Sequence, residues 1–243
     1  MSLSVTVLGC SGSFAGPEEA CSSYLVRSPD ATVVIDLGSG TLANLQHHVE
    51  VADVDALILT HEHPDHWLDL PILRNAMRYV LGLDGLAVYG TARTLAAAEA
   101  LIDETAPTFQ FATIDASSTV TVGDQQLRFS LTDHPVETLA VRVDAAGRTL
   151  LYSADTGPAW SPDKIARDID LFLCEATLPQ DQEGAAQHLS ARQAGTLARA
   201  IHAPRLVITH VSPGLEDEDQ RRDAELAFGR LAETAHTHLT FNV

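Results

Sequence analysis

A short segment about a quarter of the way along the chain carries four side chains that can bind a metal ion. Residues 61–66 read His-Glu-His-Pro-Asp-His, which places His61, His63, Asp65 and His66 within six positions. Imidazoles and carboxylates are ligands for borderline divalent metals, and such crowding has little use in a packed core. The apolar residues 57–59 just ahead are typical of a short buried strand. We therefore predict a metal site at a strand end rather than a solvated His-rich loop.

Further candidate ligands lie at the ends of other predicted strands. A hydrolytic centre with two metal ions needs more ligands than one segment provides. The residues that recur where an apolar strand gives way to a loop are His134 after 126–131, Asp155 after 150–152, and His210 after 206–209. Any one of them alone would be read as a turn or capping residue. The repeated arrangement predicts that they share one site with the first segment.

The elements that must position these residues form two blocks of strands, each followed by helices. The predicted strands are 5–8, 23–26, 32–36, 56–59, 86–89, 119–122, 126–131, 139–143, 149–152, 170–174, 206–209 and 238–242. The predicted helices are 39–48, 71–81, 91–103, 161–167, 190–201 and 216–234. This order predicts two sheets packed face to face with helices outside, an α/β fold in the form of a four-layer αββα sandwich. No linker or shift in composition interrupts it, so we expect a single domain over residues 1–243.

The charge balance restricts the partners of the protein. There are 15 Lys and Arg residues against 33 Asp and Glu, a formal net charge of -18, which disfavours long nucleic acids and anionic membranes. The three cysteines, Cys10, Cys21 and Cys174, have no C-x-x-C spacing, so neither a disulfide framework nor a thiolate zinc site is predicted. No apolar run approaches the roughly 20 residues that span a bilayer. We expect a cytoplasmic protein.

The order and spacing of the candidate ligands resemble the metallo-β-lactamase superfamily, whose H-x-H-x-D-H motif is followed by a later His, Asp and His. The resemblance implies two divalent metal ions. One ion would be bound by His61, His63 and His134, the other by Asp65, His66 and His210, and Asp155 would bridge them. A His-rich set without thiolates suits Zn²⁺, while Mn²⁺ and Fe²⁺ are also compatible with it.

Four shorter segments resemble the ribonuclease Z-like phosphodiesterases of that superfamily. These segments are Ser-Ala-Asp-Thr-Gly at 153–157, with Ala154 in place of a glycine, Cys-Glu-Ala-Thr-Leu at 174–178, His-Leu-Ser at 188–190, and Thr-His-Val-Ser-Pro at 209–213. The opening Gly-Cys-Ser-Gly-Ser at 9–13 and the absence of a long inserted arm are similar to compact actinobacterial proteins that resemble class II-like cyclic-nucleotide phosphodiesterases. The resemblance implies a phosphodiesterase acting on a small cyclic nucleotide, with 3′,5′-cyclic AMP as the first expectation.

The same resemblance implies a role for three residues in the reaction. A hydroxide shared by the two ions is the expected nucleophile, and Asp65 is expected to orient it as well as bind metal. His188 is expected to lie outside the metal ligands and protonate the leaving alkoxide. Glu175 is a candidate to hold His188 in the required tautomer. The residue types alone leave two alternatives open: a solvated helix end for His188 and a structural hydrogen-bonding role for Glu175.

Three other functions remain open from the sequence. A ribonuclease Z-like endonuclease that processes transfer RNA would need a basic surface from another subunit, because this chain lacks both the arm and the Lys and Arg residues to build one. A hydrolase of carbon esters, thioesters or lactams is compatible with the fold. A non-catalytic interaction domain is disfavoured, since every ligand position is filled. The expected partner is a small phosphodiester, and homodimers are common among the proteins that this chain resembles.

Overall fold

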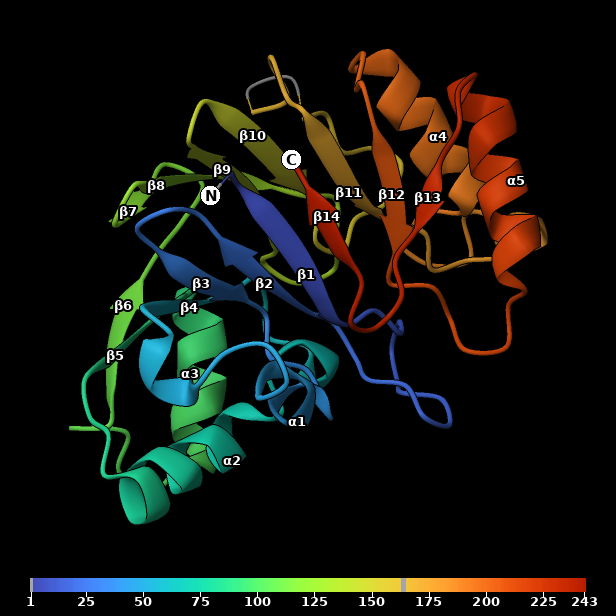
Figure 1. The fold of residues 1–243 in the computed structure, drawn as a ribbon. Coiled ribbons are helices and arrows are strands. Elements are labelled where there is room, and N and C mark those ends of the chain that lie inside the picture. The colour runs from blue at the N-terminus through green and yellow to red at the C-terminus, as the bar shows by residue number, and fades with distance from the viewer. Residues whose placement is uncertain (1, 163–164) are drawn as a thin grey trace.

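The computed structural model describes residues 2–162 and 165–243 and contains two seven-stranded sheets. The first has the order β14-β1-β2-β3-β4-β5-β6 (Figure 1). Its strands are β1 (Ser4–Gly9), β2 (Ser23–Arg27), β3 (Thr32–Ile35), β4 (Ala56–Leu59), β5 (Leu86–Gly90), β6 (Phe109–Thr113) and β14 (Thr240–Asn242). Neighbours from β3 to β6 run parallel, and those from β14 to β3 run antiparallel. Strand β14 near the C-terminus thus completes the sheet that the first strand begins.

The second sheet has the order β13-β12-β11-β10-β9-β8-β7. Its strands are β7 (Thr119–Val122), β8 (Gln125–Leu131), β9 (Leu139–Ala145), β10 (Arg148–Tyr152), β11 (Leu171–Glu175), β12 (Leu206–Thr209) and β13 (Glu233–Thr234). Neighbours from β7 to β10 run antiparallel, and neighbours from β10 to β13 run parallel. The carboxyl ends of β10, β11 and β12 therefore meet at one edge of this sheet.

The two sheets pack face to face around a shared core. Buried side chains such as Val33 from the first sheet and Leu127 from the second belong to one apolar cluster. At its centre the rings of Tyr24 on β2 and Tyr152 on β10 are 4.7 Å apart. The Tyr24 hydroxyl also forms a 2.7 Å hydrogen bond with the hydroxyl of Thr209 on β12. Apolar packing and this buried polar contact both connect the sheets.

Helices cover the outer faces of both sheets, as Figure 1 shows. The first sheet carries α1 (Thr41–Leu45), α2 (Leu70–Asn75), the π-helix η3 (Ala76–Leu81) and α3 (Ala92–Leu101), and the second carries α4 (Ala191–Ala200) and α5 (Asp217–Phe228). Short 3₁₀ turns occur at η1 (Val51–Asp53), η2 (Pro64–His66) and η4 (Gln180–Gln182). The predicted four-layer αββα sandwich is confirmed. The helix predicted at 71–81 is divided between α2 and η3, a distinction that the apolar pattern does not make.

Two predicted helices are shorter than the residue pattern indicated. The helix predicted at 39–48 is restricted to Thr41–Leu45 and continues as turns. The helix predicted at 216–234 ends at Phe228, because Gly229 adopts a left-handed conformation with a φ of 77° that stops it. Strand β13 occupies the end of that stretch instead. The second error comes from extending the helix past this glycine.

A second strand, β6, was also missed, and one predicted helix includes residues outside the described ones. Strand β6 lies at the edge of its sheet and has only partly buried alternate side chains, so its pattern is weak. The helix predicted at 161–167 includes residues 163–164, which lie outside the described residues. Beside them, the N–H groups of Ile165 and Ala166 both donate to the carbonyl of Pro162. Among the described residues, no helix has both the length and the apolar character needed to cross a membrane.

Candidate metal centre

The structure brings the seven predicted ligands together at the ends of four strands. The segment 61–66 follows β4, and the loops after β8, β10 and β12 supply the other three residues. Two groups contain all seven, one of His61, His63, His134 and Asp155 and the other of Asp65, His66 and His210, and within each group the ligand atoms lie within 4.8 Å of one another. A third group that meets the same criterion joins His188 to Asp155 and His210. The first two groups coincide with the two predicted ligand sets. Metal binding by them remains a prediction.

The carboxylate of Asp155 lies between the two groups. Its Oδ2 faces the Nε2 atoms of His61 and His134, at 3.5 Å and 3.9 Å. Its Oδ1 faces the Nε2 atoms of His66 and His210, at 3.2 Å and 3.4 Å. One oxygen is directed toward each group, which is the arrangement that a bridging carboxylate requires.

A buried carboxylate that the sequence analysis missed, Asp36, fixes the tautomers of two of these histidines. His66 donates from Nδ1 to Asp36 over 2.8 Å. The hydroxyl of Thr60 donates to the same carboxylate over 3.0 Å, and its oxygen lies 3.0 Å from Nδ1 of His61. Because the hydroxyl proton is committed to Asp36, Nδ1 of His61 must be the donor to Thr60. With Nδ1 as the donor in both histidines, Nε2 is the ring atom that faces the centre of the site.

Glu175 supports the opposite side of the site in a similar way. The hydroxyl of Thr177 donates to Glu175 over 2.7 Å, and its oxygen accepts from Nδ1 of His210 over 2.8 Å. The same carboxylate accepts from Nδ1 of His188 over 2.9 Å and from the backbone N–H of Leu189 over 3.1 Å. Glu175 is fully buried. It therefore orients one predicted ligand and the predicted acid together.

The unpaired atoms of the site fit a bound cation. Nε2 of His61 and Oδ1 of Asp155 are buried and have no hydrogen-bond partner. The Nε2 atoms of His66 and His210 face each other over 3.2 Å. Burial disfavours the charged form of His66, but Asp155 and Asp36 outweigh burial and raise its pKa well above the usual range. Lone pairs that face each other in a buried site are unfavourable unless a proton or a metal ion lies between them. The donor set of imidazoles and carboxylates suits Zn²⁺, Mn²⁺ or Fe²⁺.

The ionisation of the site also suits metal binding. Burial lowers the pKa of His61 and of His134 to about 4, so both imidazoles are neutral at pH 7, the form that ligates metal. Burial opposes the charged form of Asp155, but His210, His66 and His61 outweigh it and hold its pKa well below the usual range. For Asp65, burial is likewise outweighed by the hydrogen bond and charge of His210 and by the charge of His66, and its pKa is lowered. Both carboxylates are anionic.

His188 lies beside the two groups at the start of α4. Its ring centroid is 5.1 Å from that of His134 and 5.7 Å from that of His210. Ser190 caps α4 by accepting from the N–H of Gln193, which fixes the direction in which the chain leaves the site. Burial disfavours the charged imidazole, but the hydrogen bond and charge of Glu175 outweigh burial and raise the pKa of His188 to about 9. His188 is therefore protonated at neutral pH.

The loop after β1 braces the site through its backbone. The N–H of Ser13 donates to Oδ2 of Asp65 over 2.9 Å, and the N–H of Gly12 donates to the carbonyl of Val211. A Cβ atom at Gly12 would lie 2.7 Å from the carbonyl oxygen of His210, so only glycine fits there. The loop after β1 thus holds the carboxylate of Asp65, although Ser13 and Asp65 are 52 positions apart in the sequence.

The sequence did not reveal most of the residues that hold the predicted ligands in place through hydrogen bonds. Asp36, Thr60 and Thr177 are polar residues at strand ends, which is the signal used for the ligands, but none of them matches a metal-ligand spacing. Gln187 accepts from Nδ1 of His134 through its backbone carbonyl, so its role does not depend on its side chain. A carboxylate next to a strand end, such as Asp36 after β3, is the one feature that could have been found from the sequence.

Comparisons with known proteins agree with this architecture. Two sandwiched sheets with a His and Asp cluster at one edge define a metallo-hydrolase, and a model of the β-lactamase superfamily domain matches residues 31–211. The chain belongs to the metallo-β-lactamase superfamily.

Its sequence relatives extend over most of the chain. It is 36% identical over 255 residues to the uncharacterized protein Rv1339 of Mycobacterium tuberculosis, covering 100% of this chain and 93% of that protein. It is 30% identical over 231 residues to the probable metallo-hydrolase YhfI of Bacillus subtilis, covering 93% and 94%. It is 25% identical over 289 residues to a ribonuclease Z of Natronomonas pharaonis, covering 94% of both chains. The expected ribonuclease Z-like relatives are therefore found.

Solved structures show the same fold. The crystal structure of YhfI from Bacillus subtilis superposes with a TM-score of 0.91 at 28% identity and covers 99% of both chains. A diphosphatase from the PhnP family superposes with a TM-score of 0.80 at 17% identity and covers 99% of this chain and 98% of that one. At such low identity, the second comparison concerns the fold alone.

Proposed function

We propose that this metallo-hydrolase is a phosphodiesterase with two divalent metal ions that acts on a small cyclic nucleotide, with 3′,5′-cyclic AMP as the first candidate. The observation that carries the proposal is the position of His188, which is held by Glu175 within reach of both ligand groups. An alkoxide leaving group needs a proton as the P–O bond breaks, and a protonated imidazole at this position supplies one.

The residues that would hold the metals are the seven that converge on Asp155. His61, His63 and His134 form one set, Asp65, His66 and His210 form the other, and Asp155 lies between them. When bound, two divalent ions supply Lewis-acid charge for a phosphoryl group and lower the pKa of a water molecule. Zn²⁺ is the first expectation for their identity.

The chain's own residues position the substrate-facing groups and move one proton. The N–H of Ser13 fixes the carboxylate of Asp65, which faces the centre of the site. Because Nδ1 of His188 is bonded to Glu175, the proton that it transfers leaves from Nε2 and goes to the departing oxygen. Glu175 keeps the other ring proton in place, so the ring does not need to rotate during the transfer.

The net charge of the protein and its sequence relatives support a small phosphodiester as the substrate. A relative that covers nearly the whole chain is a ribonuclease by name, which makes phosphodiester chemistry the nearest precedent. The net charge of -18 opposes the binding of a long polyanion, whose affinity depends on Lys and Arg contacts with many phosphates. A single phosphodiester needs no such surface. A processing endonuclease for transfer RNA is the second candidate, because the same relative carries that class of activity in its name.

The test is the initial rate of 3′,5′-cyclic AMP hydrolysis by metal-reconstituted protein, measured beside unprocessed transfer RNA, a chromogenic lactam and a thioester. We expect metal-dependent formation of AMP that is abolished in His63→Ala. In His188→Ala, turnover should fall by about 100-fold or more while the metal content is unchanged. The exposed His236→Ala serves as the matched control and should keep full activity.

Three results would contradict the proposal. Cleavage of the RNA without cyclic-nucleotide turnover would establish the endonuclease instead. Hydrolysis of the lactam or the thioester alone would assign the site to lactam or thioester hydrolysis instead. Unchanged turnover in His188→Ala would remove the acid role on which the proposal depends.

A further inference from the structure

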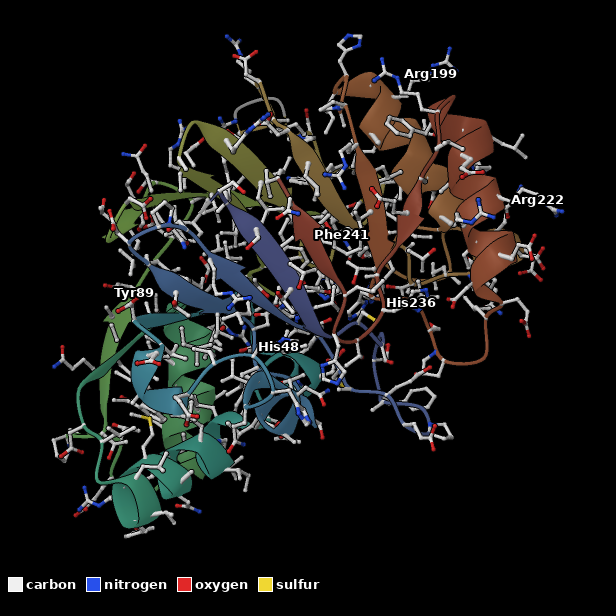
Figure 2. The ribbon with its side chains drawn as sticks, viewed as in Figure 1. His48, Tyr89, Arg199, Arg222, His236 and Phe241 are labelled. Atoms are coloured by element: carbon white, nitrogen blue, oxygen red, sulfur yellow. The ribbon has the colours of Figure 1, made fainter. Side chains whose placement is uncertain are left out.

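We propose that His48 and His238, with His47 beside them, form a second metal site on the surface of the first sheet, suited to a borderline divalent ion such as Zn²⁺. Nε2 of His48 and Nδ1 of His238 lie 2.9 Å apart although the two residues are separated by 190 positions. The ring of His47 lies 5.3 Å from that of His238. Figure 2 places His48 near the end of β1. This site does not depend on the proposed function.

The backbone holds both sides of the pair in place. His48 lies in the turn that follows α1, and the side chain of Asn44 in that helix donates to the carbonyl of Leu8 on β1 over 2.7 Å. His238 lies in the turn before β14, and its N–H donates to the carbonyl of Val7 on β1 over 2.8 Å. Both turns are therefore fastened to neighbouring residues of one buried strand. The two imidazoles meet because the backbone brings them together, with little entropy left to lose on binding.

The candidate metal centre contains a pair of histidines with which the spacing of His48 and His238 can be compared. His63 and His134, which the superfamily resemblance assigns to one ion, have facing ring nitrogens 3.1 Å apart and ring centroids 4.9 Å apart. The corresponding values for His48 and His238 are 2.9 Å and 5.1 Å. Two nitrogens on one tetrahedral Zn²⁺ are about 3.3 Å apart. The surface pair therefore needs only a small side-chain rotation to bind the same ion.

The surroundings of the pair favour a cation. On the His48 side of the pair, a recess of about 710 Å³ is lined by His47 and His48 together with the carboxylates Asp30, Glu50, Asp53 and Asp55, whereas His238 does not line it. Arg27 also lines this recess, and its positive charge offsets part of the negative charge of the carboxylates. Two imidazoles, a third nearby and solvent would complete the coordination.

An ion at this position would connect parts of the chain that are distant in sequence. It would join the turn after α1 to the turn that leads into β14, which is the edge strand of the first sheet. A ligand that binds only where the two turns are assembled stabilises the folded state in proportion to its concentration over its dissociation constant. We therefore expect bound Zn²⁺ to raise the melting temperature beyond the contribution of the metal centre.

The experiment is a Zn²⁺ titration of metal-free protein, with the number of bound ions measured after equilibrium dialysis at micromolar free Zn²⁺. We expect His48→Gln and His238→Asn each to bind one ion fewer than the unaltered protein. His202→Asn is the matched control, because His202 is also exposed and also has a positive φ, 54° against 73° for His238. Asparagine tolerates this conformation, so neither substitution should disturb the fold.

The quantity compared is the difference of one bound Zn²⁺ ion between the variants and the unaltered protein. This difference does not depend on how many ions the metal centre binds. Melting temperatures of the metal-free variants confirm that each is folded, and the extra rise in melting temperature with Zn²⁺ should disappear in His48→Gln and His238→Asn only. Equal stoichiometry in all four proteins would overturn the proposal and leave a proton as the only species shared by the pair. Loss of an equivalent in His202→Asn as well would also overturn it.

Discussion

Two buried carboxylates, one at a strand end of each sheet, support the candidate metal centre through similar hydrogen bonds. Asp36 follows β3 of the first sheet, and Glu175 is the last residue of β11 in the second. Both are fully buried, and each accepts a hydrogen bond from a threonine hydroxyl. Thr60 and Thr177 in turn accept from Nδ1 of a predicted ligand. Each sheet thus provides a carboxylate–threonine–histidine relay.

The two relays differ in what else they hold. Asp36 bonds directly to His66 and, through Thr60, to His61, and these histidines belong to different ligand groups. Glu175 reaches only one predicted ligand, His210, and uses its remaining capacity on His188 and on backbone N–H groups. The first relay therefore orients histidines of both predicted ligand sets. The second couples one metal position to the proposed proton donor.

The largest effect is expected from Asp36→Asn, which keeps the shape and the positive φ of this position but removes the charge. His66 would lose its charged acceptor, and the Thr60 hydroxyl that accepts from His61 would lose the carboxylate to which it donates. Affinity should therefore fall by about 10- to 100-fold at both metal positions. Metal content after dialysis against a competing chelator measures this. Loss of only one ion would contradict the comparison, since it predicts that Asp36 serves both.

Glu175→Gln should affect one metal position and the proton donor together. Affinity is expected to fall by about 10- to 100-fold for one ion only, while the second stays bound. Turnover of substrates with poor alkoxide leaving groups should drop by about 100-fold or more, and that of p-nitrophenyl esters should drop much less because that leaving group needs no proton. Rates on both substrate types at saturating metal separate the two effects. An equal loss on both types would place Glu175 in a purely structural role.

A matched pair of substitutions, Thr60→Val and Thr177→Val, sharpens the comparison at lower cost to the fold. Each removes one hydroxyl from a relay and should weaken one metal position by about 10-fold. Only Thr177→Val should also change the dependence of the rate on the leaving group, because Glu175 then loses the bond that aligns it beside His188. If the two variants have the same leaving-group dependence, the relays are equivalent and the proposed division of labour is wrong.

The smallest expected effect concerns stability in the metal-free protein. Glu175 raises the pKa of His188 to about 9. A raised folded-state pKa stabilises the fold fully below the unfolded value of about 6.5, and this contribution disappears as the pH rises through about 9. In Glu175→Gln this pH-dependent contribution to stability should disappear. Histidine NMR titration and thermal unfolding between pH 6 and pH 10 would show this, and a His188 that titrates near 6.5 in both proteins would contradict it.

Much of the fold and most of the site followed from local signals in the sequence. Strands such as β4 end in a polar residue cluster, and a repeated strand-then-ligand pattern was enough to bring His134, Asp155 and His210 to the segment 61–66. The four-layer sandwich follows from two blocks of strands, each with its own helices. These features depend on neighbours in the sequence or on the general rule that parallel strands end at one edge.

Features that depend on tertiary neighbours were not predicted. Asp36 becomes important only when β3 lies beside β4, which places its carboxylate against Thr60 and His66. His48 and His238 are 190 positions apart, and nothing within a window of a few residues relates them. Metal ligation by the seven residues and the roles of His188 and Glu175 stay predictions that the experiments above address.

The candidate ligands are distributed very unevenly along the chain, and this has a consequence for handling the protein. His61, His63, Asp65 and His66 are neighbours in the sequence, so they form a chelating peptide even in the unfolded chain, whereas His134, Asp155 and His210 join them only after folding. Free Zn²⁺ present during refolding would therefore bind unfolded molecules as well and offset part of its own stabilising effect. Refolding in chelator and adding metal afterwards should give the higher yield.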